Sequence, residues 1–225
     1  MPYPTIVALN EKAGILHYDK KRKQKNGDVL LLDAGANSNG YASDITRTYA
    51  RNRSGLYFEL LEGLERLHQT LLSKVASGVA FIELHHKAHL GIAKLLKENE
   101  IIAVDGEPAI ERGITKAFFP HGLGHMLGLQ VHDVGNVSTE GIEHPLRNLY
   151  PKLRTNASLA PMNVTTIEPG IYFIPTLLAK LKETDSESVT WEKIETLMPY
   201  GGMRIEDDVV VTENGSVNLT REFLS

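Results

Sequence analysis

The chain has 225 residues, of which 42% are hydrophobic and 23% charged, and its net charge of −4 argues against binding nucleic acid through bulk positive charge. The absence of cysteine excludes disulfides, thiolate metal sites, iron–sulfur clusters and a cysteine nucleophile. No apolar run approaches the roughly 18 residues that a membrane helix needs, and the first residues lack the basic and apolar regions of a signal peptide.

Short strands are expected near the N-terminus, at residues 6–9 and 15–18, on either side of a hairpin-length loop. The basic run at residues 20–25 is interpreted as a solvated turn, because a surface for polyanions would need more than one short run.

A β-hairpin is predicted next, with Asp33 at the end of an apolar strand and Asp44 on the returning strand. A turn centred between Ser38 and Asn39 would place the two aspartates opposite each other. A turn centred on Asn39-Gly40 would make them diagonal neighbours. In either case the carboxylates would lie within about 8 Å on one face, where like charges repel unless a cation lies between them.

Helices and further strands follow the hairpin. Leucines at three- and four-residue spacing predict a helix over residues 56–75, and a second helix ends near Asn99. His85 and His89 lie four apart on this second helix, but no carboxylate completes a metal set, so they are interpreted as surface residues; His68 is treated in the same way. The remaining predictions are strands at 164–167, 171–174 and 203–212, and loops at 139–160 and 180–188.

Three of the nine histidines, His121, His125 and His132, fall within thirteen residues. The His-x-x-x-His spacing invites a helical zinc-protease interpretation, but the glutamate of that motif is absent and three glycines in eight residues oppose a helix. A glycine-rich extended segment instead lets the backbone approach a metal or a substrate closely.

Two more segments carry charges next to apolar strands. Glu168 follows such a strand and precedes Pro169-Gly170. Arg204, Glu206 and Asp208 share one face of a strand by period-two alternation, so they face either water or a charged site.

Together these segments form an oxygen-rich set with one imidazole and no sulfur, which suits Mn²⁺, Co²⁺, Fe²⁺ or Zn²⁺. Four carboxylates are more than one divalent ion needs. They are reasonable for two ions roughly 3.5–4 Å apart, which could hold a bridging hydroxide.

The segments LLDAGANSNGYASDITRT, HGLGHMLGLQVHDVG, TTIEPGIYFI and GGMRIEDDVVV resemble the pita-bread metallopeptidase family, which includes methionine aminopeptidase, aminopeptidase P, prolidase and creatinase. They look most like the bacterial prolidase (Xaa-Pro dipeptidase) branch. The resemblance implies an α+β pita-bread fold, in which a curved antiparallel sheet is flanked by helices and carries a dinuclear metal site on its concave face. It further implies that residues 1–225 form a single catalytic domain, truncated at the N-terminus because the prolidase N-terminal domain and the first helical pair are missing.

The resemblance also assigns the site residues. The metal ligands would be Asp33, Asp44, His125, Glu168 and Glu206. Glu168 would also accept a proton from the bridging water, His132 would stabilise the tetrahedral intermediate, and His121 would be a further active-site histidine. The substrate would contact His17, Arg154 and Arg204, with Arg154 receiving its C-terminal carboxylate, while Thr46 and Thr166 would orient ligands.

The implied activity is the hydrolysis of Xaa-Pro dipeptides with two divalent ions, foremost Mn²⁺. The alternatives are a methionine aminopeptidase or aminopeptidase P type activity, an inactive module that binds peptides or proteins, and a side activity on phosphoesters. The expected partner is a small peptide, with no nucleic acid and no membrane. The expected location is cytoplasmic, and a homodimer is one option for the oligomeric state.

Overall fold

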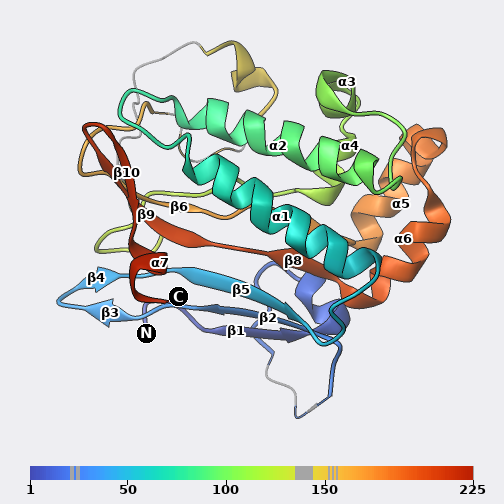
Figure 1. Cartoon of the computed structure of the whole chain (residues 1–225), viewed down its shortest axis with the longest axis horizontal. Coiled ribbons are helices and arrows are strands. Elements are labelled where there is room, and N and C mark those ends of the chain that lie inside the picture. Colours follow the sequence, from blue (N-terminus) through green and yellow to red (C-terminus); the bar gives the residue numbers. More distant parts are fainter. Residues whose placement is uncertain are drawn as a thin grey trace.

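The computed structural model describes residues 1–20, 23, 26–134, 144–151, 153, 155 and 157–224. Within the described residues, antiparallel strands form two three-stranded sheets and two two-stranded ones, and the long helices α1 and α2 cover one side of the molecule (Figure 1). The predicted α+β arrangement of antiparallel strands flanked by helices is confirmed.

The first sheet contains the predicted hairpin. Its strands are β1 (Ile6–Leu9), β2 (Val29–Ala34) and β5 (Ile45–Ala50), in the order β1-β2-β5, with β3 (Asn37–Ser38) and β4 (Tyr41–Ala42) pairing beyond them. Asn39 and Gly40 form the turn with φ values of 51° and 90°, and these two positive φ values are what a type I′ hairpin turn requires. Because Asp33 pairs with Thr46, Asp44 is its diagonal neighbour, which confirms the second of the two predicted registers.

The second sheet brings late segments of the chain against the first. Its strands are β6 (Val164–Ile167), β9 (Asp207–Thr212) and β10 (Gly215–Asn218), and β7 (Gly170–Tyr172) pairs with β8 (Gly202–Arg204). The single strand expected over 203–212 is therefore divided in two. The interruption lies at Ile205 and Glu206, where Glu206 forms an isolated bridge with Thr46 of the first sheet.

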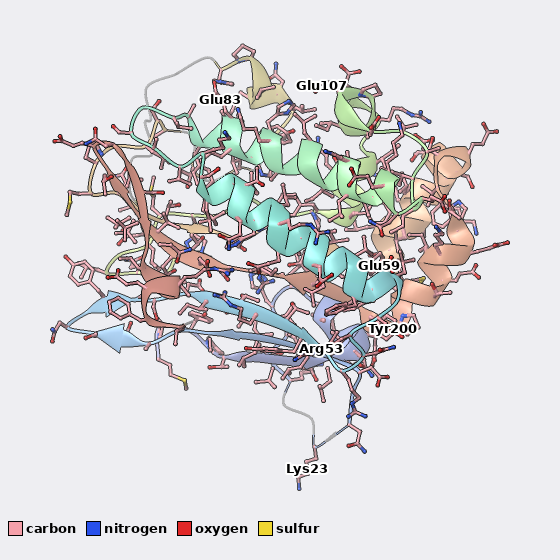
Figure 2. The ribbon with its side chains drawn as sticks, viewed as in Figure 1. Lys23, Arg53, Glu59, Glu83, Glu107 and Tyr200 are labelled. Atoms are coloured by element: carbon pink, nitrogen blue, oxygen red, sulfur yellow. The ribbon has the colours of Figure 1, made fainter. Side chains whose placement is uncertain are left out.

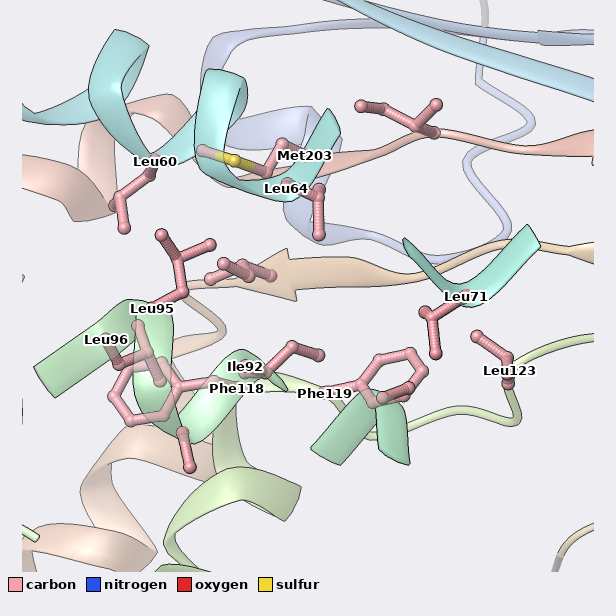
Figure 3. Packing of buried hydrophobic residues seen from close by; sticks show 14 of the residues in the cluster. Leu60, Leu64, Leu71, Ile92, Leu95, Leu96, Phe118, Phe119, Leu123 and Met203 are labelled. Carbon is pink, nitrogen blue, oxygen red and sulfur yellow. The ribbon is translucent and has the colours of Figure 1, made fainter. Parts of the chain in front are cut away.

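The helices supply most of the apolar core. They are α1 (Leu56–Leu72), α2 (Phe81–Glu98), α3 (Gly106–Glu111), α4 (Ile114–Phe118), α5 (Pro175–Asp185), α6 (Trp191–Leu197) and α7 (Leu219–Phe223). Leu60 and Leu64 of α1 pack against residues of α2 and against Met203 of β8 (Figure 3). On the outer surface, the charged side chains of Glu59, Glu83 and Glu107 point away from this core (Figure 2). In the part of the chain that the structure describes, no helix is long and apolar enough to cross a bilayer.

Three sequence predictions were wrong. Residues 15–18 form no strand, and a short 3₁₀ turn, Asn10–Gly14, precedes them. Most of the polar stretch 180–188 belongs to helix α5 rather than to a loop, because Leu178 and Leu181 bury one narrow apolar face. The histidines assigned to the surface, His68, His85 and His89, are all buried.

Candidate active site

A cavity of about 540 Å³ lies where the two sheets meet the histidine-rich segment. Every predicted metal ligand, catalytic residue and substrate contact that the structure describes lines it, namely His17, Asp33, Asp44, His121, His125, His132, Glu168, Arg204 and Glu206, whereas Thr46 and Thr166 lie behind the wall. Arg154 lies outside the described residues. The structure therefore brings together side chains that are spread over almost two hundred positions of sequence.

Strand pairing places the carboxylates. Asp33 ends β2, Asp44 precedes β5, and the bridge to Thr46 brings Glu206 beside them. The hydroxyl of Thr46 donates a hydrogen bond to Glu206 Oε2 at 2.7 Å. The Asp208 carboxylate accepts a hydrogen bond from the backbone N–H of Asp44 at 3.1 Å, which links the main chain of Asp44 to β9. Asp208 is therefore buried and in contact with the site rather than facing water.

His125 completes the most compact donor group. One ligand atom each from Asp44, His125 and Glu206 all lie within 4.8 Å of one another. His125 Nε2 is 3.4 Å from Asp44 Oδ2 and 3.8 Å from Glu168 Oε1. Its Nδ1 lies 3.0 Å from the carbonyl oxygen of Met126, so Nδ1–H donates there and Nε2 is turned towards the carboxylates.

Gly124 explains why the histidine-rich segment is extended and glycine-rich. A Cβ atom added to Gly124 would lie 2.0 Å from the carbonyl oxygen of Thr166. This close contact lets the Thr166 N–H donate to the His125 carbonyl oxygen at 3.0 Å, and the Thr166 hydroxyl also accepts the His125 N–H at 3.2 Å. Thr166 thus contributes to holding His125 in place.

Arg204 is the cation among these carboxylates. Its guanidinium donates to Asp33 Oδ2, and its Nε lies 3.8 Å from Glu206 Oε2 and 4.0 Å from Glu168 Oε2. Its Nη1 donates to the Tyr172 hydroxyl at 2.9 Å. Because Arg204 is itself buried, these contacts stabilise both its charge and the negative charges around it.

The protonation of the site reflects burial and crowding. Burial, together with the charges of Asp44 and Asp33, raises the pKa of Glu168 to about 7. Burial and the neighbouring carboxylates raise the pKa of Glu206 well above its ordinary value. Burial opposes the charged form of His125, but its contacts with Asp44 and Glu168 outweigh this and raise its pKa. The group therefore retains protons that a bound cation would displace.

His121 is neutral and fixed in one tautomer. Burial lowers its pKa to about 3. Its Nδ1 lies 2.8 Å from the Gly122 carbonyl oxygen and its Nε2 lies 2.9 Å from the Tyr172 hydroxyl. Nδ1–H therefore donates to the carbonyl and Nε2 accepts from the phenol, whose oxygen in turn accepts from Arg204. The ring of His132 lies 4.4 Å from that of His125, and His17 is exposed at the cavity wall.

Sequence reasoning missed two tyrosines. Tyr3 places its hydroxyl 2.6 Å from Asp33 Oδ1 and 2.5 Å from Asp44 Oδ1. Tyr172 joins Arg204 to His121. No spacing signal marks Tyr3, because its segment is irregular and precedes β1. Tyr172 lies four residues after Glu168 in a segment whose glutamate was singled out, so its position was visible in the sequence although its role was not.

The donor set fits divalent metal ions. It combines buried carboxylates with one imidazole that can bind in its neutral form, and it contains no sulfur. Such oxygen and nitrogen donors are the ligands that hard to borderline ions prefer. Buried like charges at these separations repel strongly, and a multivalent cation between them removes that repulsion. The roles of the individual ligands remain predictions.

Comparison with known proteins finds a family match over most of the chain. Residues 1–213 match the model of metallopeptidase family M24. The chain is 44% identical over 227 residues to an Xaa-Pro dipeptidase of Shewanella woodyi, and 44% identical over 229 residues to one of Citrobacter koseri. Each alignment covers 99% of this chain and 52% of the relative, so the chain spans about half the length of the curated relatives it matches.

Solved structures give the same fold. A variant of Escherichia coli aminopeptidase P superposes with a TM-score of 0.77 at 31% identity, and Pseudomonas aeruginosa aminopeptidase PepP superposes with 0.77 at 32%. Both comparisons cover 100% of this chain and 45% of the other. A zinc-substituted E. coli aminopeptidase P with product superposes with a TM-score of 0.74 at 30% identity. The fold is therefore the predicted pita-bread fold.

Replacing Gly124 by alanine should destabilise the chain, because the new Cβ would collide with the Thr166 carbonyl oxygen. We expect the free energy of unfolding to fall by about 1–3 kcal/mol or more, measured by urea denaturation. Gly122→Ala is the matched control in the same segment, since the nearest atom to its Cβ would be a Leu153 methyl group at 3.3 Å. Equal losses in the two variants would contradict the close-contact explanation.

Removing the Tyr3 hydroxyl should weaken metal binding. Tyr3→Phe deletes the donor that orients the Asp33 and Asp44 carboxylates, and loss of such a partner costs about 10–100-fold in affinity. Titration calorimetry with Mn²⁺ measures the change. Tyr49→Phe, on an exposed position of β5, should leave affinity unchanged, and an unaltered affinity in Tyr3→Phe would remove this role from Tyr3.

Metal binding should release protons. Glu168, Glu206 and His125 all have raised pKa values, and ligands must be deprotonated to bind a metal. At pH 6 Glu168, with a pKa of about 7, and His125, with a pKa raised above the usual 6.5, largely retain their protons, so we expect about one proton or more per chain to be released, and fewer as pH rises through about 7. Calorimetry in buffers of different ionisation enthalpy measures the number. A binding heat that is independent of the buffer at pH 6 would show that the pKa values are not raised.

Proposed function

This chain belongs to metallopeptidase family M24, and on that basis we propose that it hydrolyses Xaa-Pro dipeptides with the help of two divalent metal ions. The observation that carries the proposal is the convergence of Asp44, His125 and Glu206 within 4.8 Å, with Asp33 and Glu168 lining the same cavity. We propose these five side chains as the metal ligands. Ions bound there would polarise the scissile carbonyl and lower the pKa of a bound water.

The identity of the ions follows from the donors. Carboxylate oxygens outnumber the single imidazole, and such sets suit Mn²⁺ better than the soft ions that thiolates select. We therefore propose Mn²⁺ as the preferred metal, with Co²⁺, Fe²⁺ and Zn²⁺ as competitors. The E. coli aminopeptidase P described above has been solved in a zinc-substituted form, which is a property of that protein.

Glu168 is the residue best suited to move the proton. Its pKa of about 7 lies near neutral pH, where a carboxyl group can both accept and return a proton. Its side chain is only partly buried and borders the cavity. Arg204 Nε lies 4.0 Å from Glu168 Oε2, so the guanidinium charge favours the ionised carboxylate and opposes the effect of burial, and the neutral ring of His121 lies 3.6 Å away.

The cavity wall supplies groups for substrate contact. His17 and His132 are exposed there and His121 lies further in. We propose that His132 stabilises the charge that develops on the substrate carbonyl oxygen, and that His17 contacts the substrate. We keep Arg154 as the proposed partner of the substrate's C-terminal carboxylate on the family resemblance alone.

The dipeptide preference rests on the relatives. The chain is 44% identical to proteins named Xaa-Pro dipeptidase and 31–32% identical to aminopeptidase P structures. The two activities share the bond before proline and differ in the length of the peptide after it. Aminopeptidase P activity is therefore the second candidate, supported by the superposition at a TM-score of 0.77.

A substrate panel tests the proposal. With Mn²⁺ present, we expect turnover of Ala-Pro and Leu-Pro, little turnover of Ala-Pro-Leu and none of Met-Ala-Ser. Glu206→Gln should lower Ala-Pro turnover by roughly 100-fold or more while circular dichroism stays unchanged, and Glu213→Gln, on an exposed position, serves as the control.

The remaining outcomes separate the alternatives. Preferential cleavage of Ala-Pro-Leu would favour the aminopeptidase P activity. Stoichiometric metal binding with no turnover of any peptide would favour an inactive binding module. Full activity of Glu206→Gln would remove Glu206 from the ligand set.

A further inference from the structure

Two buried histidines lie behind the cavity wall rather than on it. His68 of α1 and His85 of α2 are 0% and 4% exposed, and neither lines the cavity. A polar ring in an apolar core is unfavourable unless its nitrogens find partners. Each of these rings has a partner in the main chain of a segment that carries site residues.

His85 reaches the histidine-rich segment. Its Nδ1 accepts the backbone N–H of Leu123 at 3.2 Å, and Leu123 lies midway between His121 and His125. The carbonyl oxygen of the same residue accepts the backbone N–H of Glu168 at 2.7 Å. The main chain of Leu123 thus connects helix α2 to both the histidine-rich segment and Glu168.

His68 contacts the backbone just before Glu168. Its Nε2–H donates to the carbonyl oxygen of Ile167 at 2.9 Å, and Ile167 directly precedes Glu168. The opposite nitrogen, Nδ1, has no hydrogen-bond partner within the described ranges. The contact with Ile167 is therefore the main polar interaction that holds this ring, with Asp207 Oδ2 farther away at 3.9 Å.

Both rings are neutral. Burial lowers the pKa of His68 to about 4 and that of His85 to about 3. In the neutral state each ring offers one donor and one acceptor. His68 uses its donor and His85 uses its acceptor, so both carry the proton on Nε2.

From this geometry we propose that His68 and His85 are positioning residues, which hold the main chain around Glu168 and His125 so that the two donors converge on the cavity. Helix α1 acts through Ile167, and helix α2 acts through Leu123. The consequence for metal binding rests on the proposed function, whereas the consequence for the backbone does not.

Packing alone does not account for these residues. Leu123 lies beside Phe119 and Leu71 in the core (Figure 3), and an apolar side chain in place of either histidine would also exclude water. It would leave a buried N–H at Leu123 or a buried carbonyl at Ile167 without its partner, however, and unpaired buried groups are unfavourable enough to shift a backbone segment. A packing role and a positioning role therefore differ in their prediction for an apolar substitution of similar shape. Only the positioning role predicts that such a substitution disturbs the site.

Matched variants separate them. His85→Asn keeps an acceptor near the position of Nδ1 and His85→Leu removes it; His68→Gln keeps a donor near the position of Nε2 and His68→Met removes it. We expect the Leu and Met variants to lose about 10–100-fold in Mn²⁺ affinity and to lower kcat more than they raise KM. The Asn and Gln variants should stay near the parent protein.

His89 provides the control for a purely structural effect. It is equally buried on α2, where its ring packs edge-on against that of His85 with 4.7 Å between ring centroids, but its own hydrogen bond goes to Thr115 and it stacks on Tyr150, and both of these partners lie outside the two site segments. His89→Leu should lower the melting temperature and leave Mn²⁺ affinity unchanged. If His85→Leu and His68→Met behave like His89→Leu, or if the Asn and Gln variants fail as badly as the apolar ones, the proposal is wrong.

Amide hydrogen exchange of the metal-free protein keeps this test independent of activity. We expect the Leu123 and Glu168 amides to exchange about 10-fold faster or more in His85→Leu, with protection restored in His85→Asn. Unchanged protection in His85→Leu would overturn the proposal. A chain that binds no metal but shows this exchange pattern would overturn the proposed function while leaving the positioning role supported.

Discussion

Mutual repulsion among closely spaced carboxylates is the constraint on which the rest of this structure depends. Four of them line one cavity: Asp33, Asp44, Glu168 and Glu206. Away from bulk water such charges interact strongly, so the chain must neutralise them, share protons among them or bind cations. It does the first through Arg204 and the second through raised pKa values. The arrangement is poised to exchange those protons for metal ions.

The strand that follows Glu206 shows how this concentration of charge is supported from behind. Asp207 points away from the cavity, where it pairs with Arg47 of β5 and Arg221 of α7, each at 2.6 Å. Asn218 donates to the same carboxylate at 2.7 Å. Because neighbouring residues of a strand face opposite sides, fixing Asp207 on one side also fixes the backbone that presents Glu206 and Asp208 on the other. The charged residues on the two faces of this strand therefore act together to hold the site carboxylates in place.

Local signals in the sequence predicted the hairpin that pairs the two aspartates, while the pita-bread fold and the ligand set were predicted from the family resemblance. Asn39-Gly40 specifies a type I′ turn, and that turn alone sets the diagonal relation of Asp33 to Asp44. The alternation of Arg204, Glu206 and Asp208 left two interpretations, a face towards water or a face towards a charged site. All three side chains are buried, which confirms the charged site. Long-range pairing was not predictable. The bridge between Thr46 and Glu206 joins positions 160 residues apart, and no local pattern encodes its register.

The buried histidines show where a signal was present and misjudged. His85 lies four residues after Phe81, His89 lies three before Ile92, and His68 lies between Leu64 and Leu71 at helical spacing. All three therefore fall on the apolar stripes of their helices, and periodicity alone predicts their burial. The surface interpretation rested on the absence of a carboxylate that would complete a metal set, and it did not consider where the histidines lie on these stripes.

A polar residue on an apolar stripe must find a hydrogen-bond partner inside the core. Backbone N–H and C=O groups of irregular segments are the available partners, since those of regular strands and helices already bond to one another. In this chain two backbone stretches that carry site residues lie against the core. Leu123 lies in the extended histidine-rich segment, and Ile167 lies where β6 ends before Pro169. The glycines and the proline keep this backbone out of regular structure and so leave some of its N–H and C=O groups without a partner. Histidines of α1 and α2 supply those hydrogen bonds, so the two helices contribute to the geometry of the site as well as covering it.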